Sequence, residues 1–167
     1  KILHESKLYI VTMPNYTVDL IESYIKDYVI NKQVSYVCYD YIVESSSVSS
    51  NIAKKNGVST RPDQVLAAIA SKLKDLAVEY NIAVLSFTQV SDNVHDREIL
   101  DSSVAAGCKS IKNKADIYGV IMPLRKKEQD IADMMLEKFP NKTKPNRCLH
   151  MDKMRFFDIS TFQVFLS

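Results

Sequence analysis

Two polar side chains stand at the ends of two apolar, β-branched runs and are the first candidates for chemistry. Asp40 interrupts the run 34–42, and Gln89 closes the run 82–89. Functional groups of an open α/β sheet collect at the carboxyl ends of its strands. A carboxylate there can hold the water shell of Mg²⁺ bound to phosphates, and an amide can sense a γ-phosphate or orient water. The pair indicates a nucleotide-hydrolysing sheet; the alternative is that Asp40 caps the next turn and Gln89 bonds to backbone.

A second pair of candidates is cationic. Lys153 and Arg155 lie two residues apart at the end of the alternating run 147–154, so their side chains are expected on one face of a strand. Two cations on one face can stabilise the charge that develops on a transferred phosphoryl group. The alternative is a solvated pair that protects a sheet edge from aggregation.

The sequence lacks the usual phosphate-binding loop and a zinc site. No G-x-x-x-x-G-K-[ST] stretch occurs, and the chain has only 3 glycines, so the groups that cradle β- and γ-phosphates are missing from it. We therefore expect a partial nucleotide-binding domain that is inactive alone. The three cysteines and three histidines do not have the spacing of zinc ligands. Widely spaced cysteines in odd number are typical of a reducing, cytoplasmic location.

Composition indicates a single globular domain spanning residues 1–167. The chain is 46% hydrophobic and 25% charged, and no run approaches the ~18 apolar residues of a membrane span. The net charge of +2 is unevenly distributed, because residues 107–155 carry 12 Lys/Arg against 6 Asp/Glu, whereas residues 1–106 carry 10 against 13. A basic segment can attract the phosphates of a nucleotide or a nucleic acid, and the alternative is a solvated lysine-rich surface.

The elements that must position the candidates alternate between strand and helix. Apolar runs predict strands at 8–12, 34–42, 82–87, 115–122, 147–154 and 161–166. Apolar spacing predicts helices after Thr17, from Thr60 to near Asn81, and over 104–111 and 126–139. The polar stretches 44–57 and 91–103 are expected to be loops. This order predicts a mostly parallel α/β sheet flanked by helices, with an antiparallel hairpin at the C-terminal end.

Six short motifs follow one another along the whole chain. They are Leu8-Tyr9-Ile10, the strand end Asp40-Tyr41, the helical stretch 73–81, the run 85–89, Lys114-Ala115-Asp116 and Lys153-Met154-Arg155. In this order they resemble the C-terminal two-thirds of the RecA-like motor domain of DnaB-type replicative helicases, whose "ADV" strand and Lys-x-Arg element correspond to the last two. The family has a Gly-rich element after Lys-x-Arg, whereas this chain has Phe-Phe-Asp-Ile-Ser at 156–160.

The resemblance implies a role for each candidate. Asp40 would be the Walker B carboxylate that acts on Mg²⁺ of ATP, and Gln89 would link the γ-phosphate to a DNA-binding loop. Lys153 and Arg155 would be finger residues that reach the ATP of a neighbouring subunit in a hexameric ring. Single-stranded DNA would pass through the channel of that ring. Its phosphates would contact cations of the loops 45–58 and 91–103, and these cations are Lys54, Lys55 and Arg97; the alternative is that they are ordinary exposed charges.

The sequence therefore favours part of an ATP-dependent DNA helicase as the function, and a phage is one source of such a helicase. By the resemblance, the phosphate loop and a strand bearing the catalytic glutamate would precede Lys1, so the domain is expected to be incomplete. Two other functions remain open. One is another RecA-like ATPase, such as a recombinase or a circadian-clock-type ring protein. The other is a non-catalytic α/β interaction domain that keeps the sheet without nucleotide chemistry.

Overall fold

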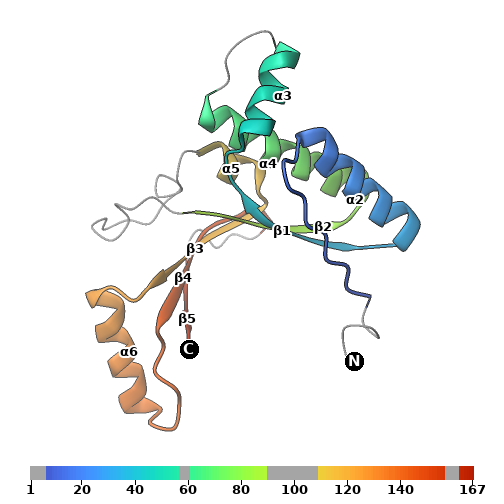
Figure 1. Cartoon of the computed structure of the whole chain (residues 1–167). Helices are drawn as coiled ribbons and strands as arrows, with labels where there is room; N and C mark the ends of the chain where they lie inside the picture. The colour runs from blue at the N-terminus through green and yellow to red at the C-terminus, as the bar shows by residue number, and fades with distance from the viewer. Residues whose placement is uncertain (1–6, 57–60, 90–108, 157–161) are drawn as a thin grey trace.

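The computed structural model describes residues 7–56, 61–89, 109–156 and 162–167 (Figure 1). In chain order the described elements are α2 (Val18–Lys32), β1 (Tyr36–Ile42), α3 (Ser46–Asn56), α4 (Pro62–Glu79), β2 (Ala83–Thr88), α5 (Lys109–Lys114), β3 (Ile117–Pro123), α6 (Lys126–Lys138), β4 (Arg147–Met154) and β5 (Phe162–Leu166). Strands and helices are mixed along the chain, so the predicted α/β class is confirmed. None of the helices within these ranges is long and apolar enough to cross a membrane.

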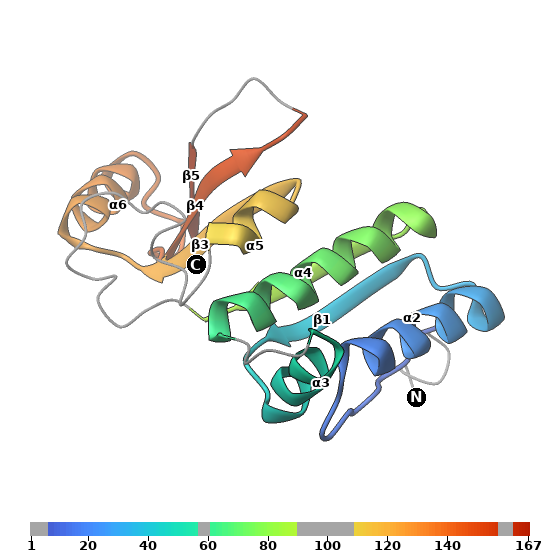
Figure 2. The same ribbon diagram turned by 90° about the horizontal axis from the view of Figure 1, so that it is seen from above.

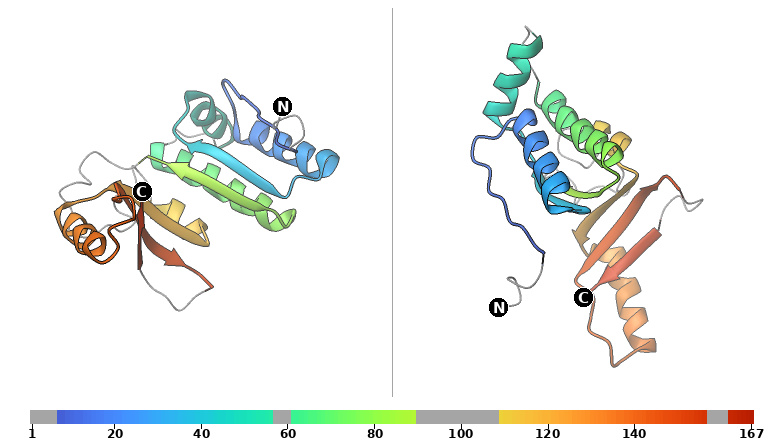
Figure 3. Two further views of the ribbon diagram at one scale, coloured as in Figure 1. Left: turned by 90° about the horizontal axis from the view of Figure 1, so that it is seen from below. Right: turned by 90° about the vertical axis from the view of Figure 1, so that its right-hand side faces the viewer.

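A parallel pair of strands forms the first sheet. β1 pairs with β2 in a register that joins Tyr36 to Ala83 and Ile42 to Thr88, so both strands end at the same edge. Helices α2 and α4 lie on one face of this pair, and the view from below shows the strands in front of them (Figure 3). The core between helices and strands is made of apolar side chains that are almost fully buried: Ile21, Ile25, Tyr39, Ile42, Val65, Ile69, Leu73 and Leu76.

Local signals in the sequence explain where the two covering helices begin. The Thr17 hydroxyl accepts a hydrogen bond from the Leu20 amide at 3.2 Å and so caps α2. Pro62 occupies the first position of α4, where its missing N–H costs nothing, and the Gln64 side chain accepts from the Arg61 amide at 3.1 Å. The buried residues of α4 recur every three or four positions, which gives one apolar stripe toward the sheet.

An antiparallel sheet of three strands forms the second part, with β4 between β3 and β5. The predicted C-terminal hairpin is confirmed, since β4 and β5 pair from Arg147–Leu166 to Met151–Phe162. Gly119 lies at a register shift between β3 and β4, and a Cβ there would meet the Leu149 and Met151 side chains at 2.9 Å. Among the described strands, one pairing is therefore parallel and two are antiparallel. α5 packs on α4 and connects the two parts (Figure 2).

A buried carboxylate lies where helix α6 meets the antiparallel sheet. Glu128 is only 1% exposed and accepts hydrogen bonds from the guanidinium and the backbone amide of Arg125. Its oxygen also lies 3.9 Å from His150 Nε2 on β4. The Arg125 hydrogen bond holds the pKa of Glu128 below its usual value, whereas burial lowers the pKa of His150. The cluster therefore keeps Glu128 charged and His150 neutral near pH 7.

Two predicted features are wrong. Residues 8–12 form no regular secondary structure and pair with no strand in the described part of the chain, and Leu8 and Ile10 are 58% and 80% exposed. Apolar β-branched residues favour strands because they fit a half-buried pleated surface. They therefore form a strand only where a neighbouring strand lies alongside. The predicted loop 44–57 contains helix α3. Its serine-rich composition disfavours helix, but Val48 is fully buried and Ile52, one turn later, packs on the core.

Two further predictions fall partly or wholly outside the described residues. The helix expected over 104–111 is described only from Lys109, where α5 begins. The loop expected over 91–103 lies outside the described ranges.

Candidate functional site

Asp40 and Gln89 lie at the same edge of the β1–β2 sheet. Asp40 is two residues from the end of β1, and Gln89 follows directly after β2. Parallel pairing brings them together, because Ile42 opposes Thr88 and the Gln89 amide lies 3.4 Å from the Tyr41 hydroxyl. Both side chains are exposed. This edge therefore presents a carboxylate and an amide from positions far apart in the sequence.

Neither side chain makes the contacts that a purely local structural role predicts. Within the described residues, which include the turn after β1, the Asp40 carboxylate makes no hydrogen bond or ion pair. The Gln89 amide donates to a side-chain oxygen rather than to backbone. Within the described residues, the Asp40 carboxylate is thus exposed and unpaired, whereas the Gln89 amide is bonded to Tyr41.

Two tyrosines fix the strand end that carries Asp40. Tyr39 is buried and points to the opposite face of β1, where its ring meets Tyr16 edge-on with centroids 6.4 Å apart. Tyr16 donates a hydrogen bond from its hydroxyl to the Val43 carbonyl at 3.2 Å. Burial raises the pKa of Tyr39, so this phenol stays neutral. The end of β1 is therefore anchored on one face while the other face remains open.

Lys153 and Arg155 come together on the antiparallel sheet. Lys153 Nζ donates to the carbonyls of Lys112 and Asn113 at 2.8 and 3.2 Å, which lie at the end of α5. Arg155 Nη1 lies 2.9 Å from Oδ1 of Asp116, the residue just before β3. Burial lowers the pKa of Lys153, and the charge of Arg155 adds to this effect. The predicted pair thus exists as two neighbouring cations tied to the α5–β3 connection.

The two groups of candidates belong to different sheets. None of the contacts described for the chain joins Lys153 or Arg155 to Asp40 or Gln89, and β1–β2 is not paired with β3–β4–β5 in the described ranges. The cationic pair therefore makes no direct contact with the Asp40 edge of the same chain.

Sequence reasoning missed two residues of the charged cluster around Lys153 and Arg155: the carboxylate of Asp116 and the cation of Lys74. Lys74 on α4 approaches the other oxygen of Asp116 at 2.6 Å, so the carboxylate lies between two cations. The Lys74 hydrogen bond, with the positive charges around it, holds the pKa of Asp116 below its usual range. Asp116 was visible only as part of the Lys114-Ala115-Asp116 motif. No local pattern links it to Lys74, which is 42 positions earlier.

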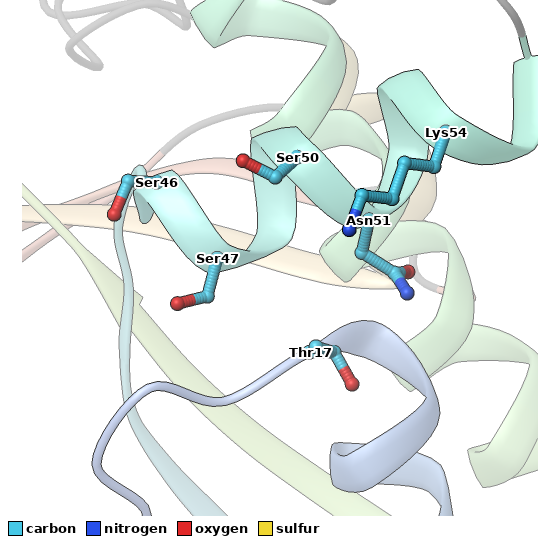
Figure 4. A pocket seen from close by; sticks show the side chains of 6 residues that line it. All are labelled: Thr17, Ser46, Ser47, Ser50, Asn51 and Lys54. Carbon is cyan, nitrogen blue, oxygen red and sulfur yellow. The ribbon is translucent and has the colours of Figure 1, made fainter.

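Lys54 lies on α3 beside an open polar pocket of about 380 Å³. The pocket is lined by Thr17, Ser46, Ser47, Ser50, Asn51 and Lys54, and Figure 4 shows the side chains of Asn51 and Lys54 pointing toward the start of α2. In the part of the chain that the structure describes, the buried Oδ1 of Asn51 has no hydrogen-bond partner. Lys54 is exposed, so its cation is accessible from solvent.

The other predicted DNA contacts cannot be placed in the same way. The Lys55 side chain and Arg97 lie outside the described residues. Among the residues that are described, no group of three or more His, Cys, Asp or Glu side chains is arranged to hold a metal ion. Asp40 is therefore not part of a cluster of three or more such groups within the described residues.

The fold and this edge define an α/β domain that collects functional groups at the carboxyl ends of parallel strands. Comparison with known proteins identifies the family to which this domain belongs. The family model of the DnaB-like helicase C-terminal domain matches residues 1–164. The chain therefore belongs to the DnaB-like helicase family, a family of replicative helicase motors.

Two relatives illustrate the similarity. The SPbeta prophage-derived uncharacterized protein YorI of Bacillus subtilis (strain 168) is 34% identical over 171 residues, which cover 99% of this chain and 33% of YorI. The solved structure of a DnaB-like replicative helicase, described with its interactions with primase, superposes with a TM-score of 0.64 at 15% identity. That match covers 96% of this chain and 35% of the helicase and supports the fold alone. The chain spans about a third of the length of both proteins.

Proposed function

We propose that this chain is part of the motor of a replicative DNA helicase that couples hydrolysis of Mg-ATP to movement along single-stranded DNA. Residues 1–167 would form one partial RecA-like domain, and the whole protein would act as a hexameric ring that unwinds duplex DNA. The observation that carries the proposal is the shared edge of Asp40 and Gln89 in a chain of the DnaB-like helicase family.

Asp40 suits the role of the carboxylate that acts on Mg²⁺. Magnesium is usually held by one or two carboxylates together with water and substrate phosphates, so a single exposed carboxylate fits an ion that arrives with ATP. The metal would neutralise charge on the phosphates during transfer. Asp40 would orient the water shell of that ion, and the tyrosine contacts on the opposite face of β1 would keep the strand end in place.

Gln89 suits the role of a γ-phosphate sensor. Its amide lies at the Asp40 edge and just before residues 91–103, which the family resemblance assigns to DNA binding. A change of hydrogen-bond partner from the Tyr41 hydroxyl to a phosphate oxygen would shift the start of that segment. This would connect the state of the nucleotide to contact with DNA.

The cations would act outside the Asp40 site. Lys153 and Arg155 would stabilise charge on the ATP of the neighbouring subunit, which agrees with the lack of any described contact between them and Asp40 of their own chain. Lys54 would contact phosphates of single-stranded DNA from α3, as would Lys55 and Arg97.

The test is the ATPase rate of the full-length protein with Asp40→Asn. Removing the charge that acts on Mg²⁺ is expected to lower kcat about 100-fold or more, because metal stabilisation of the transition state is worth several kcal/mol. Asp130→Asn is the matched control, since Asp130 is an exposed carboxylate on α6. A non-catalytic interaction domain predicts that neither substitution changes the rate, and equal rates for the two variants would overturn the proposal.

A further inference from the structure

The end of β4 carries a network of opposite charges that joins α4, α5, β4 and the turn between α5 and β3. Lys74 of α4, Lys112 of α5, and Lys153 and Arg155 at the end of β4 surround two carboxylates, Asp116 and Asp152. Lys112 pairs with Asp152 at 2.6 Å, while Asp116 pairs with Lys74 and Arg155. Four cations against two carboxylates leave an excess of positive charge at this place.

Asp116 holds Arg155 at two points. Its side-chain Oδ1 accepts from Arg155 Nη1 at 2.9 Å, and its backbone carbonyl accepts from the Arg155 amide, also at 2.9 Å. Arg155 Nη2 reaches the Asn113 carbonyl at 3.4 Å. A guanidinium that is fixed by its own backbone and by a charged partner loses much of its rotational freedom before it meets a phosphate.

The hold leaves part of Arg155 available to a ligand. Its side chain is 45% exposed, whereas those of Asp116 and Lys74 are 32% and 28% exposed. Lys74 balances the carboxylate from the other side, so Asp116 does not cancel the positive charge of Arg155. Asp116 thus fixes the direction of the guanidinium while the site stays electropositive.

We propose that Asp116 is a positioning residue that aims Arg155 at the ATP of the neighbouring subunit, with Lys74 as its second partner. The inference rests on the proposed function, because it assigns to Asp116 the preparation of a finger that acts between subunits. A misplacement of about 1 Å at a reacting centre can cost about 100-fold in rate. Asp116 then matters for hydrolysis without touching the nucleotide itself.

The first experiment measures steady-state ATP hydrolysis by the full-length protein. Asp116→Ala is expected to lower kcat by about 10- to 100-fold and to leave KM for ATP within about twofold, because the interaction that it removes is made only in the transition state. Asp133→Ala is the matched control, since Asp133 on α6 also pairs with a lysine, Lys144, at 2.6 Å. If kcat of Asp116→Ala equals that of Asp133→Ala, the proposal is overturned.

The second experiment separates positioning between subunits from a merely structural role. Subunits with Asp116→Ala keep their own Asp40, and subunits with Asp40→Asn keep an intact finger. In mixed head-to-tail rings of equal parts, about one quarter of the interfaces combine an intact Asp40 with an intact finger. ATPase activity is therefore expected to rise well above that of either variant alone, toward about a quarter of wild type.

Arg155→Ala mixed with Asp40→Asn is the reference for this rescue. If the Arg155→Ala mixture recovers ATPase activity and the Asp116→Ala mixture does not, Asp116 does not act through the finger on the neighbouring subunit's ATP. The inference is then wrong while the proposed function stands. If neither mixture recovers, the finger itself does not act between subunits, and the proposed function fails together with the inference. Should Asp116→Ala not fold, Asp116→Asn replaces it, because it keeps one acceptor oxygen for Arg155 and removes the charge.

Discussion

Replacing Val48 by alanine tests whether α3 is a packed helix, and we expect the free energy of unfolding to fall by about 2 kcal/mol. The Val48 side chain is fully buried, although it lies in the serine-rich stretch Ser46–Asn56. The two carbon atoms that are removed account for ~1.6 kcal/mol at about 0.8 kcal/mol each. The remaining cavity adds up to about 1 kcal/mol, and the higher helix propensity of alanine offsets about 0.5 kcal/mol.

The assay is urea unfolding followed by far-ultraviolet circular dichroism, with the slope of the transition checked for two-state behaviour. Val78→Ala is the matched control, because it makes the same chemical change in helix α4 at a side chain that is 67% exposed. We expect its free energy of unfolding to stay within about 0.5 kcal/mol of wild type. If Val48→Ala and Val78→Ala give the same stability, Val48 is not buried and α3 does not pack on the core.

Two further predictions concern charged residues of the helices. The Glu22 carboxylate accepts hydrogen bonds from Lys26 and Lys72, both at 2.8 Å, and these lower its pKa from 4.5 to about 2. Its folded-state pKa is depressed, so the stabilisation is present above pH 4.5 and is lost as the pH falls toward 2. After solvent screening it amounts to about 1 kcal/mol. Glu22→Gln is expected to remove this contribution and flatten acid unfolding in that window, and an unchanged pH profile would contradict the assignment. For DNA, Lys54→Ala in the full-length protein is expected to weaken binding to single strands and to reduce the salt slope by about 0.7 for each phosphate that is no longer neutralised. Lys126→Ala, an exposed lysine of α6, is the control, and equal salt slopes for the two variants would remove Lys54 from the DNA surface.

Several elements could be predicted from the sequence because their signals are local. The alternation over 147–154 predicts β4 with the bounds that the structure has, and the apolar stripe of α4 has helical spacing. The edge formed by Asp40 and Gln89 was also predictable, since parallel strands with a helix between them end on the same side.

The errors arose where tertiary packing decides. Val48 and Ile52 are two apolar residues among polar ones, and only the core beneath them makes α3 a helix. Residues 8–12 have the composition of a strand, but pairing depends on a neighbouring backbone rather than on their own sequence. The ion pairs of Asp116 could not be predicted, because Lys74 and Arg155 meet it from distant parts of the chain.

We propose that Asp40 belongs to a motor that unwinds DNA. The most direct test is strand separation of a forked duplex by the full-length protein, with and without Mg-ATP, for wild type and Asp40→Asn. We predict that wild type separates the strands only when Mg-ATP is present and that Asp40→Asn does not separate them. Unwinding by Asp40→Asn at the wild-type rate, or no unwinding by wild type with Mg-ATP, would contradict the account.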